Sequence, residues 1–328
     1  MLMTRNDAAE KIAAGATLYL AADESILASL PRGNWIGGSI PYFMDSRGGT
    51  HSRELVFVKE QDPSVTEVSV RWYTADTLQS IPSDSPENGF SVVILPATST
   101  VHVRYAQEAP DFPGLFFKNI VGWISGVDLA DLGKVKPRVF NGLTGESSSE
   151  DALVMHASLP PEKSASVGIV NCFKQGAGDS ITFPNDGFAV DHCFVNGVQK
   201  NLAEYLNALG ADTRLPLVAD YNGEMVNVSF QNVDVNERKV TLYAPVFAGV
   251  EYRLASPVDN YVERFRERIP VDVLNPEFSC NCILNYLYSE LEGKKTGKLT
   301  GPVTFGEIAY QLLNQTLVYL QISDTRSA

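Results

Sequence analysis

Short stretches rich in Val, Ile, Phe and Tyr recur along this chain, separated by turns rich in Gly, Pro, Asn and Asp. Such stretches are typical of β-strands. Residues 66–73 alternate cleanly, with Val68, Val70 and Trp72 on one face. The expected strands outnumber the expected helices and do not alternate regularly with them. We therefore expect an α+β fold, with two lobes of mixed, mostly antiparallel β-sheet and flanking helices.

Helices are expected where apolar residues recur at helical spacing or where Ala-rich segments end at Gly or Pro. These segments are residues 6–15, 24–30, 98–108, 199–209, 257–268 and 282–292. In the third, Thr100 is the expected cap, and in the fourth Gly210 closes the helix.

The length of the chain favours two domains. It has 328 residues, of which 44% are apolar, and chains beyond roughly 250–300 residues usually divide. The helix at 199–209 and the segment after it suggest a boundary near residue 200. We expect one domain over residues 1–200 and another over residues 201–328.

Charge and cysteine content limit the partners. The formal net charge is −13, and no cluster of Lys and Arg is present that would replace phosphate counterions. Binding to nucleic acid or to an anionic membrane is therefore not expected. No secretory signal is recognisable, and no run reaches the roughly 18 apolar residues that span a bilayer. Four cysteines are too few for a disulfide framework in a chain this long, so we expect a reducing cytoplasm.

Three short motifs near the C-terminus are the most specific feature of the sequence: Phe278-Ser279-Cys280, Gly306-Glu307-Ile308 and Asn314-Gln315-Thr316. With the turn at residues 36–39, whose sequence is Ile-Gly-Gly-Ser, and the segment at residues 140–145, they resemble the FIST domain. That domain is a sensory input module of bacterial signal-transduction proteins. Residues 1–200 resemble its N-terminal half and residues 201–328 its C-terminal half.

The resemblance implies a cytoplasmic, non-enzymatic sensor. Such a protein binds a small polar molecule, such as an amino acid, between its two halves and signals to a separate protein partner. No catalytic residue, metal or cofactor is expected on this basis. The ligand-binding residues that we expect lie in the small-residue turns that carry the resemblance: Gly37, Gly38, Ser39, Asn141, Ser279, Cys280, Asn281, Cys282, Glu307 and Asn314.

Several of these residues also have a purely structural interpretation. Asn281 or Ser279 is able to cap the helix that follows, and Glu307 to cap another, instead of holding a ligand ammonium group. Asn314 favours a turn as much as a pocket. Gly37 and Gly38 are explained equally well by close backbone packing or by a pocket wall.

Two alternative functions remain at this stage. A helix N-terminus lowers the pKa of a thiol, so Cys280 or Cys282 would serve in a cysteine-dependent hydrolase or transferase. A haem-binding gas sensor would need an axial ligand such as His102 or His156. No Cys-x-x-Cys-His motif is present to attach the haem covalently.

Overall fold

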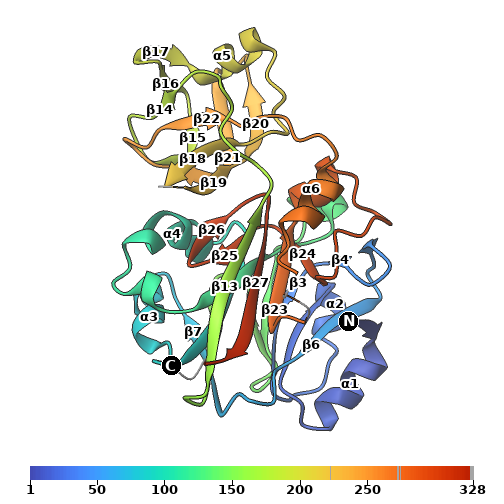
Figure 1. The fold of residues 1–328 in the computed structure, drawn as a ribbon. Coiled ribbons are helices and arrows are strands. Elements are labelled where there is room, and N and C mark those ends of the chain that lie inside the picture. Colours follow the sequence, from blue (N-terminus) through green and yellow to red (C-terminus); the bar gives the residue numbers. More distant parts are fainter. Residues whose placement is uncertain (222, 272, 274, 326–328) are drawn as a thin grey trace. The chain divides into compact units, whose positions relative to one another are not determined.

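The computed structural model describes residues 1–221, 223–271, 273 and 275–325 and divides the chain into two compact units (Figure 1). The first unit consists of residues 1–170, 269–312 and 316–328, and the second of residues 171–268 and 313–315. Residues 171–200 thus group with residues 201–268 rather than with residues 1–170. Residues 269–312, near the C-terminus, group with residues 1–170. This division differs from the boundary expected at residue 200.

The α+β class is confirmed, because helices accompany sheets that are mostly antiparallel with some parallel pairs. The first unit contains three six-stranded sheets. In spatial order, the first sheet is β1 (Leu2–Thr4), β6 (Leu55–Glu60), β2 (Leu18–Ala22), β3 (Trp35–Ser39), β10 (Val139–Asn141) and β11 (Glu146–Ser148).

The second sheet is β26 (Gln311–Leu313), β25 (Glu307–Ala309), β9 (Ile120–Ser125), β8 (Gly89–Pro96), β12 (Ala152–Ser158) and β7 (Glu67–Tyr73). The third is β13 (Lys163–Asn171), β27 (Thr316–Asp324), β23 (Phe278–Cys282), β24 (Gly301–Thr304), β4 (Tyr42–Met44) and β5 (Gly49–His51).

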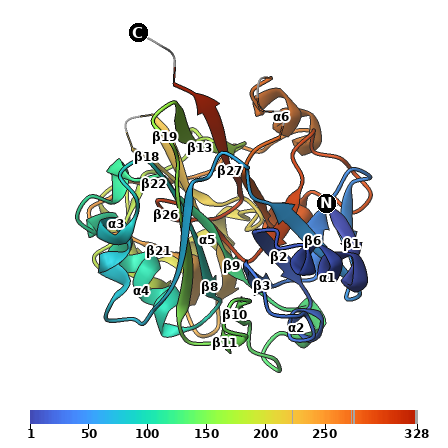
Figure 2. The same cartoon turned by 90° about the horizontal axis from the view of Figure 1, so that it is seen from below.

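The helices of this unit are short. The α-helices are α1 (Arg5–Ala13), α2 (Glu24–Leu27), α3 (Ile81–Asp84), α4 (Thr100–Glu108) and α7 (Ile283–Tyr288), and the 3₁₀-helices are η1 (Leu78–Ser80), η2 (Ala109–Asp111), η3 (Leu115–Phe117) and η4 (Leu129–Asp131). Helices α1 and α2 lie beside the first sheet, whereas α4 lies beside β8 (Figure 2). The expected cap of α4, Thr100, is wrong by one residue: the Ser99 side chain accepts the hydrogen bond from the His102 N–H.

The same topology occurs three times in the first unit. Two parallel strands are joined by a helix in β2–α2–β3, in β8–α4–β9 and in β23–α7–β24. In each case a later strand returns to pair antiparallel with the first of the two: β6 with β2, β12 with β8 and β27 with β23. We call these the first, second and third repeats.

The repeats exchange strands in a cycle. After its parallel pair, each repeat sends one strand to another repeat: β4 pairs with β24, β10 with β3 and β25 with β9. In Figure 1 the orange and red strands of the third repeat accordingly lie among the blue and green strands. Because the third repeat completes sheets with the other two, residues near the C-terminus cannot form a separate domain.

In its described residues, the second unit contains one six-stranded sheet, one three-stranded sheet and two helices. The first sheet has the order β17 (Val198–Asn201), β16 (His192–Val195), β14 (Ile181–Thr182), β22 (Tyr252–Leu254), β18 (Leu217–Tyr221) and β19 (Glu224–Val228). The second has the order β15 (Gly187–Val190), β21 (Lys239–Val246) and β20 (Phe230–Asp234), and the helices are α5 (Leu202–Leu209) and α6 (Tyr261–Arg268).

Helix α5 begins and ends where its local sequence dictates. The Asn201 side chain accepts a hydrogen bond from the Glu204 N–H at 3.0 Å, which satisfies one free donor of the first turn. Gly210 follows the helix in the left-handed conformation, with φ of 63°. The helix expected over residues 199–209 is therefore confirmed from residue 202, and the preceding residues extend β17 instead.

Candidate functional site

Four of the expected ligand-binding residues form a buried cluster in the third repeat. Cys280, Asn281 and Cys282 end β23, and Glu307 begins β25. The Asn281 Oδ1 accepts hydrogen bonds from the Cys282 N–H at 2.8 Å and from the Asn285 Nδ2 at 2.9 Å. All four side chains are buried in the interior of the first unit, so their local bonding orders β23 and the start of α7.

Glu307 is a buried strand residue rather than part of a turn or a helix cap. Its Oε2 accepts hydrogen bonds from the Thr316 hydroxyl at 2.9 Å and from the Thr316 N–H at 3.3 Å. Burial raises the pKa of this carboxyl well above its usual range. Burial thus disfavours the charged form that would attract a ligand ammonium group.

The four cysteines are free and buried. Burial raises the pKa of the Cys280 thiol well above its usual range, and the nearby Glu307 adds to this effect. Burial likewise raises the pKa of Cys172 and Cys193 to about 11. A cysteine nucleophile needs a thiolate in an accessible, electropositive place, and this environment does not favour one.

The histidines considered for haem are engaged otherwise. The ring nitrogens of the buried His156 lie 2.8 Å from the Tyr73 hydroxyl and 2.7 Å from the Ser91 hydroxyl. The His102 Nδ1 accepts a hydrogen bond from the Thr98 N–H at 3.1 Å. Burial lowers the pKa of both rings to about 4. Neither arrangement favours an axial ligand.

The turn expected at residues 36–39 is wrong: Gly37 and Gly38 lie within strand β3, where they allow close packing. A Cβ on Gly38 would lie 2.7 Å from the Trp123 Nε1 and 2.8 Å from the Ile94 Cγ2. Only glycine therefore lets β3 approach β8 and β9 this closely. The next residue, Ser39, donates a hydrogen bond to the Gly126 carbonyl at 2.8 Å and accepts one from the Arg138 N–H at 2.9 Å.

Asn141 and Asn314 are held by contacts of their own. The Asn141 Oδ1 accepts a hydrogen bond from the Leu143 N–H at 3.0 Å and so orders the turn after β10. Asn314 belongs to the second unit, where its carbonyl accepts a hydrogen bond from the Asn227 Nδ2 at 3.1 Å. Within the first unit, the expected residues are therefore divided between the interior of the third repeat, the close contact of β3 and the turn after β10.

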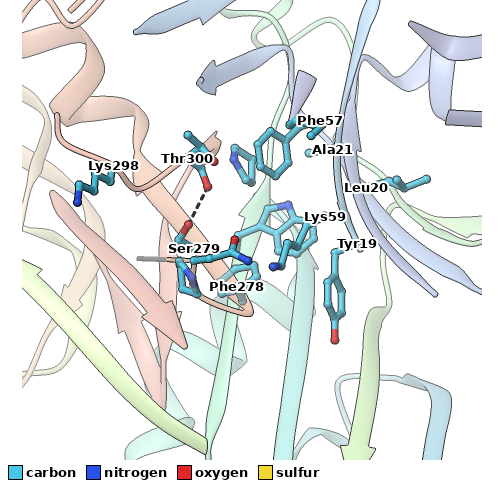
Figure 3. A pocket seen from close by; sticks show the side chains of 14 residues that line it. Tyr19, Leu20, Ala21, Phe57, Lys59, Phe278, Ser279, Lys298 and Thr300 are labelled. Atoms are coloured by element: carbon cyan, nitrogen blue, oxygen red, sulfur yellow. Dashed lines mark hydrogen bonds between the residues drawn. The ribbon is translucent and has the colours of Figure 1, made fainter. Parts of the chain in front are cut away.

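One of them, Ser279, lines a hollow of about 190 Å³ in the first unit, which we call the lysine pocket (Figure 3). The hollow has aromatic and aliphatic walls and carries two lysines at its edge. Its lining residues are Met1, Tyr19, Leu20, Ala21, Phe57, Lys59, Trp123, Asn275, Pro276, Phe278, Ser279, Lys298, Thr300 and Pro302. They come from β2, β6, β9, β23 and β24, from the segments before β23 and β24, and from Met1, which precedes β1.

The two lysines of the lysine pocket are available to a ligand. Among the residues that the structure describes, neither Lys59 nor Lys298 has an ion-pair partner. The Trp123 indole N–H has no hydrogen-bond partner within the same residues, although the side chain is buried. The Ser279 hydroxyl donates to the Thr300 carbonyl at 2.8 Å, which leaves its oxygen able to accept (Figure 3). The pocket thus combines apolar walls with free positive charge.

A buried carboxyl lies behind this pocket. Glu277 is 3% exposed, and its Oε2 accepts a hydrogen bond from the Asp62 N–H at 3.0 Å. Burial raises its pKa to about 7, although the positive charge of Lys59 opposes this. The Tyr19 hydroxyl, which accepts a hydrogen bond from the Gln61 Nε2 at 3.1 Å, lies close enough for the charge of Glu277 to raise its pKa.

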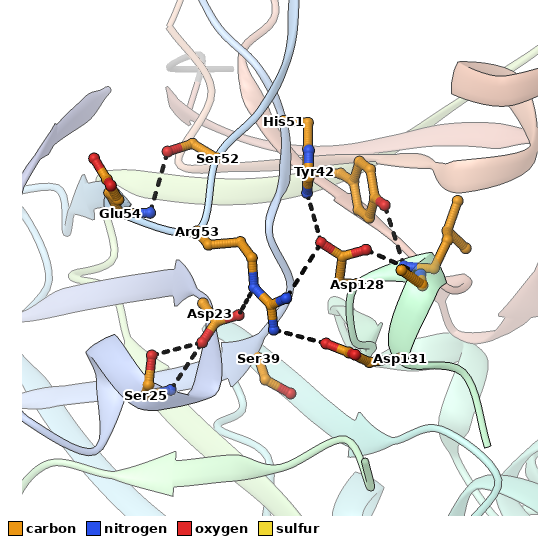
Figure 4. Close-up of polar contacts among 12 residues, drawn as sticks. Asp23, Ser25, Ser39, Tyr42, His51, Ser52, Arg53, Glu54, Asp128 and Asp131 are labelled. Atoms are coloured by element: carbon orange, nitrogen blue, oxygen red, sulfur yellow. Dashed lines mark hydrogen bonds and ion pairs between the residues drawn. The ribbon is translucent and has the colours of Figure 1, made fainter. Parts of the chain in front are cut away.

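A second hollow, of about 280 Å³, lies at the ends of β3 and β9, and we call it the arginine pocket. There the Arg53 Nε lies 3.0 Å from an Asp23 oxygen, and its Nη2 lies 2.7 Å from an Asp131 oxygen (Figure 4). Its Nη1 lies 3.9 Å from the Asp128 Oδ2, and this oxygen also lies 2.8 Å from the His51 Nε2. The cation of this pocket is therefore already paired with three carboxylates.

Local bonding fixes the carboxylates of the arginine pocket. Asp128 begins η4 and accepts a hydrogen bond from the Ala130 N–H at 3.0 Å, and Asp23 caps α2 by accepting one from the Ser25 N–H at 3.1 Å. The Ala130 N–H, with His51 and Arg53, lowers the pKa of Asp128. These contacts hold the segments together and leave little charge for a ligand.

Sequence reasoning found Ser279 but missed Lys59, Trp123 and Glu277. A signal for Lys59 exists in β6: it continues the face of Phe57, one residue after the buried Val58. A lysine on an otherwise apolar strand face is unusual, and such a position indicates a local use for the charge. Trp123 and Glu277 gain their roles from contacts distant in sequence, for which the local pattern holds no signal.

The described part of the chain contains no helix that is long and apolar enough to cross a membrane. Within the same residues, no group of three or more His, Cys, Asp or Glu side chains is placed to hold a metal ion.

Comparisons with known proteins give one match. Neither a curated protein nor a solved structure matches the chain. A model of a protein family matches residues 3–323, which is nearly the whole chain and draws on both units. The chain therefore belongs to the family of unknown function DUF6976.

Proposed function

We propose that this protein is a cytoplasmic, non-enzymatic sensor that binds a small carboxylate, such as an amino acid, in the lysine pocket. One observation carries the proposal: Lys59, without an ion-pair partner among the described residues, stands at the edge of a hollow with aromatic walls. The volume of about 190 Å³ is below the roughly 300–1,000 Å³ of pockets for drug-sized ligands, which favours a small ligand.

The chemistry of the pocket suits a ligand with two different ends. A carboxylate next to Lys59 would form a charge-assisted hydrogen bond, which is stronger than a neutral one. The Ser279 hydroxyl, whose hydrogen is donated to the Thr300 carbonyl, offers the ligand an acceptor. Phe57 and Phe278 offer apolar surface to the body of the ligand, and burial of that surface supplies a further favourable contribution.

The sensory part of the proposal has a different basis. It rests on the resemblance of the motifs around Ser279, Glu307 and Asn314 to the FIST family. The signal would pass to a separate protein partner. Ligand binding in the pocket and signalling are therefore tested separately, and binding comes first.

The test is a comparison of carboxylates with their amides, measured by thermal shift and calorimetry. The panel contains benzoate with benzamide, acetate with acetamide, and amino acids. We expect at least one carboxylate to stabilise the protein saturably and its amide not to do so. The Lys59→Met variant should bind that carboxylate at least about tenfold more weakly, which corresponds to about 1.4 kcal/mol.

A matched control is Lys239→Met, since Lys239 is exposed on β21 in the second unit. This variant should bind as the unchanged protein does. The proposal is wrong for this pocket if no carboxylate binds, or if Lys59→Met and Lys239→Met bind with equal affinity.

A further inference from the structure

We propose that the lysine pocket binds its carboxylate together with one proton, which Glu277 takes up as the ligand enters. This rests on the proposed function of the pocket. Glu277 lies between Pro276 and Phe278, both of which line the hollow, and it acts on the same lysine that would hold the ligand.

The surroundings of Glu277 leave it able to accept a proton. Its Oε2 is held by the Asp62 N–H, whereas its Oε1 has no hydrogen-bond partner among the described residues. The side chain is almost completely buried, so water stabilises the charged form little. Its pKa of about 7 means that both forms are populated at neutral pH.

The charged and titratable groups around Glu277 come from three elements. Lys59 on β6 favours the ionised form, and Asp62, in the segment after β6, disfavours it. Tyr19 on β2 stays protonated, because burial and the charge of Glu277 raise its pKa. Two groups act on these neighbours: Lys163 on Asp62, and the Met1 amino group on Lys59.

Competition for Lys59 couples the ligand to the proton. In the free pocket, Lys59 is the cation that compensates an ionised Glu277. A ligand carboxylate beside Lys59 brings a second negative charge toward the same ammonium group, and a like charge raises the pKa of the more buried carboxyl. One proton from solution then binds the Glu277 carboxylate, and no bond of the ligand changes. By linkage, protonation of Glu277 must strengthen ligand binding by the same factor.

The experiment is calorimetry with benzoate, which stays ionised throughout, at pH values of about 6, 7 and 8. Each pH is measured in two buffers with different ionisation enthalpies. We expect the affinity to fall by up to about tenfold from pH 6 to pH 8 and the complex to take up a proton at the higher pH. In Glu277→Gln the affinity should be independent of pH, because glutamine keeps the acceptor for the Asp62 N–H but does not titrate.

The outcomes separate this inference from the proposed function. Proton uptake that disappears in Glu277→Gln supports the inference. Benzoate binding with no proton uptake, or the same pH dependence in Glu277→Gln, overturns the inference and leaves the binding function standing. Absence of carboxylate binding even at pH 6 overturns both. If Glu277→Gln does not fold, absence of proton uptake by the unchanged protein still overturns the inference.

Discussion

The lysine pocket and the arginine pocket lie in the same unit, yet their cations are used in opposite ways. Arg53 contacts three carboxylates, two of which also cap short helices. Lys59 has no such partner among the described residues and faces aromatic side chains. A paired cation stabilises the fold, whereas an unpaired one at a hollow is available for binding. A charged side chain alone therefore does not identify a binding site. The useful signal is whether that side chain already has a partner of opposite charge.

The carboxyl groups of the two pockets differ in the same sense. Asp128, beside Arg53, has a lowered pKa because the Ala130 N–H and two basic side chains favour its charge. Glu277, behind Lys59, has a raised pKa because burial disfavours its charge. The first carboxyl is fully ionised at neutral pH, and the second changes its charge there. The two pockets should therefore respond to pH in opposite directions.

Replacement of Glu277 should give the largest effect. A carboxyl whose folded pKa is raised from 4.5 to about 7 stabilises the fold below pH 4.5, and this contribution is lost as the pH rises through 7. The full difference is roughly 3 kcal/mol. Glu277→Gln removes this dependence. The unfolding free energy of the variant minus that of the unchanged protein should therefore increase by roughly 3 kcal/mol from about pH 4 to about pH 8.

Urea unfolding across this pH range measures the difference. Glu237→Gln, at an exposed position, is the control and should leave the pH profile unchanged. Parallel pH profiles for the unchanged protein and Glu277→Gln would show that the pKa of Glu277 is not raised. The carboxyls of the two pockets would then not differ in the way described above.

A smaller difference in stability is expected between alanine variants of the serines in the two pockets. Ser39, at the arginine pocket, is 2% exposed and makes two hydrogen bonds that join β3 to the ends of β9 and β10. Ser279, at the lysine pocket, is 7% exposed and makes one. We expect Ser39→Ala to cost about 2 kcal/mol, because it leaves buried backbone groups unpaired, and Ser279→Ala about 1 kcal/mol. Equal losses of unfolding free energy in Ser39→Ala and Ser279→Ala, measured by urea unfolding, would contradict a purely structural role for Ser39.

The sequence predicted the elements whose cause is local. Strand β7 follows from the alternation of Val68, Val70 and Trp72, and α5 from its apolar face and Gly210. The division of the chain could not be predicted in this way. It depends on β4 pairing with β24, which joins residues near 43 to residues near 302. No periodicity within either segment records which distant strand completes its sheet.

The candidate site shows the same limit. The motif around Ser279 led to a wall of the lysine pocket, but Cys280 and Glu307 in the same motifs are interior residues of the third repeat. Small polar residues at strand ends serve equally for packing and for binding, so their type does not decide between the two. The pKa of Glu277 depends on burial, which arises only when several distant segments are assembled.

The smallest effect concerns Asp128, and its sign is opposite to that of Glu277. A carboxyl with a lowered pKa stabilises the fold above its unfolded value of 3.8, and this contribution is lost as the pH falls through the folded value. Asp128→Asn keeps an acceptor for the Ala130 N–H but removes the charge beside Arg53 and His51. Because both partners are substantially exposed, the loss at neutral pH should stay below about 1 kcal/mol.

Relative to the unchanged protein, Asp128→Asn should therefore lose stability as the pH rises through the range below 3.8, whereas Glu277→Gln should gain stability as the pH rises toward 8. Both are measured in the same series of urea titrations. If both variants gain stability, or both lose it, as the pH rises, the carboxyls of the two pockets do not have opposite pKa shifts. In that case Lys59 loses its distinction from Arg53 as the group that a carboxylate ligand would meet.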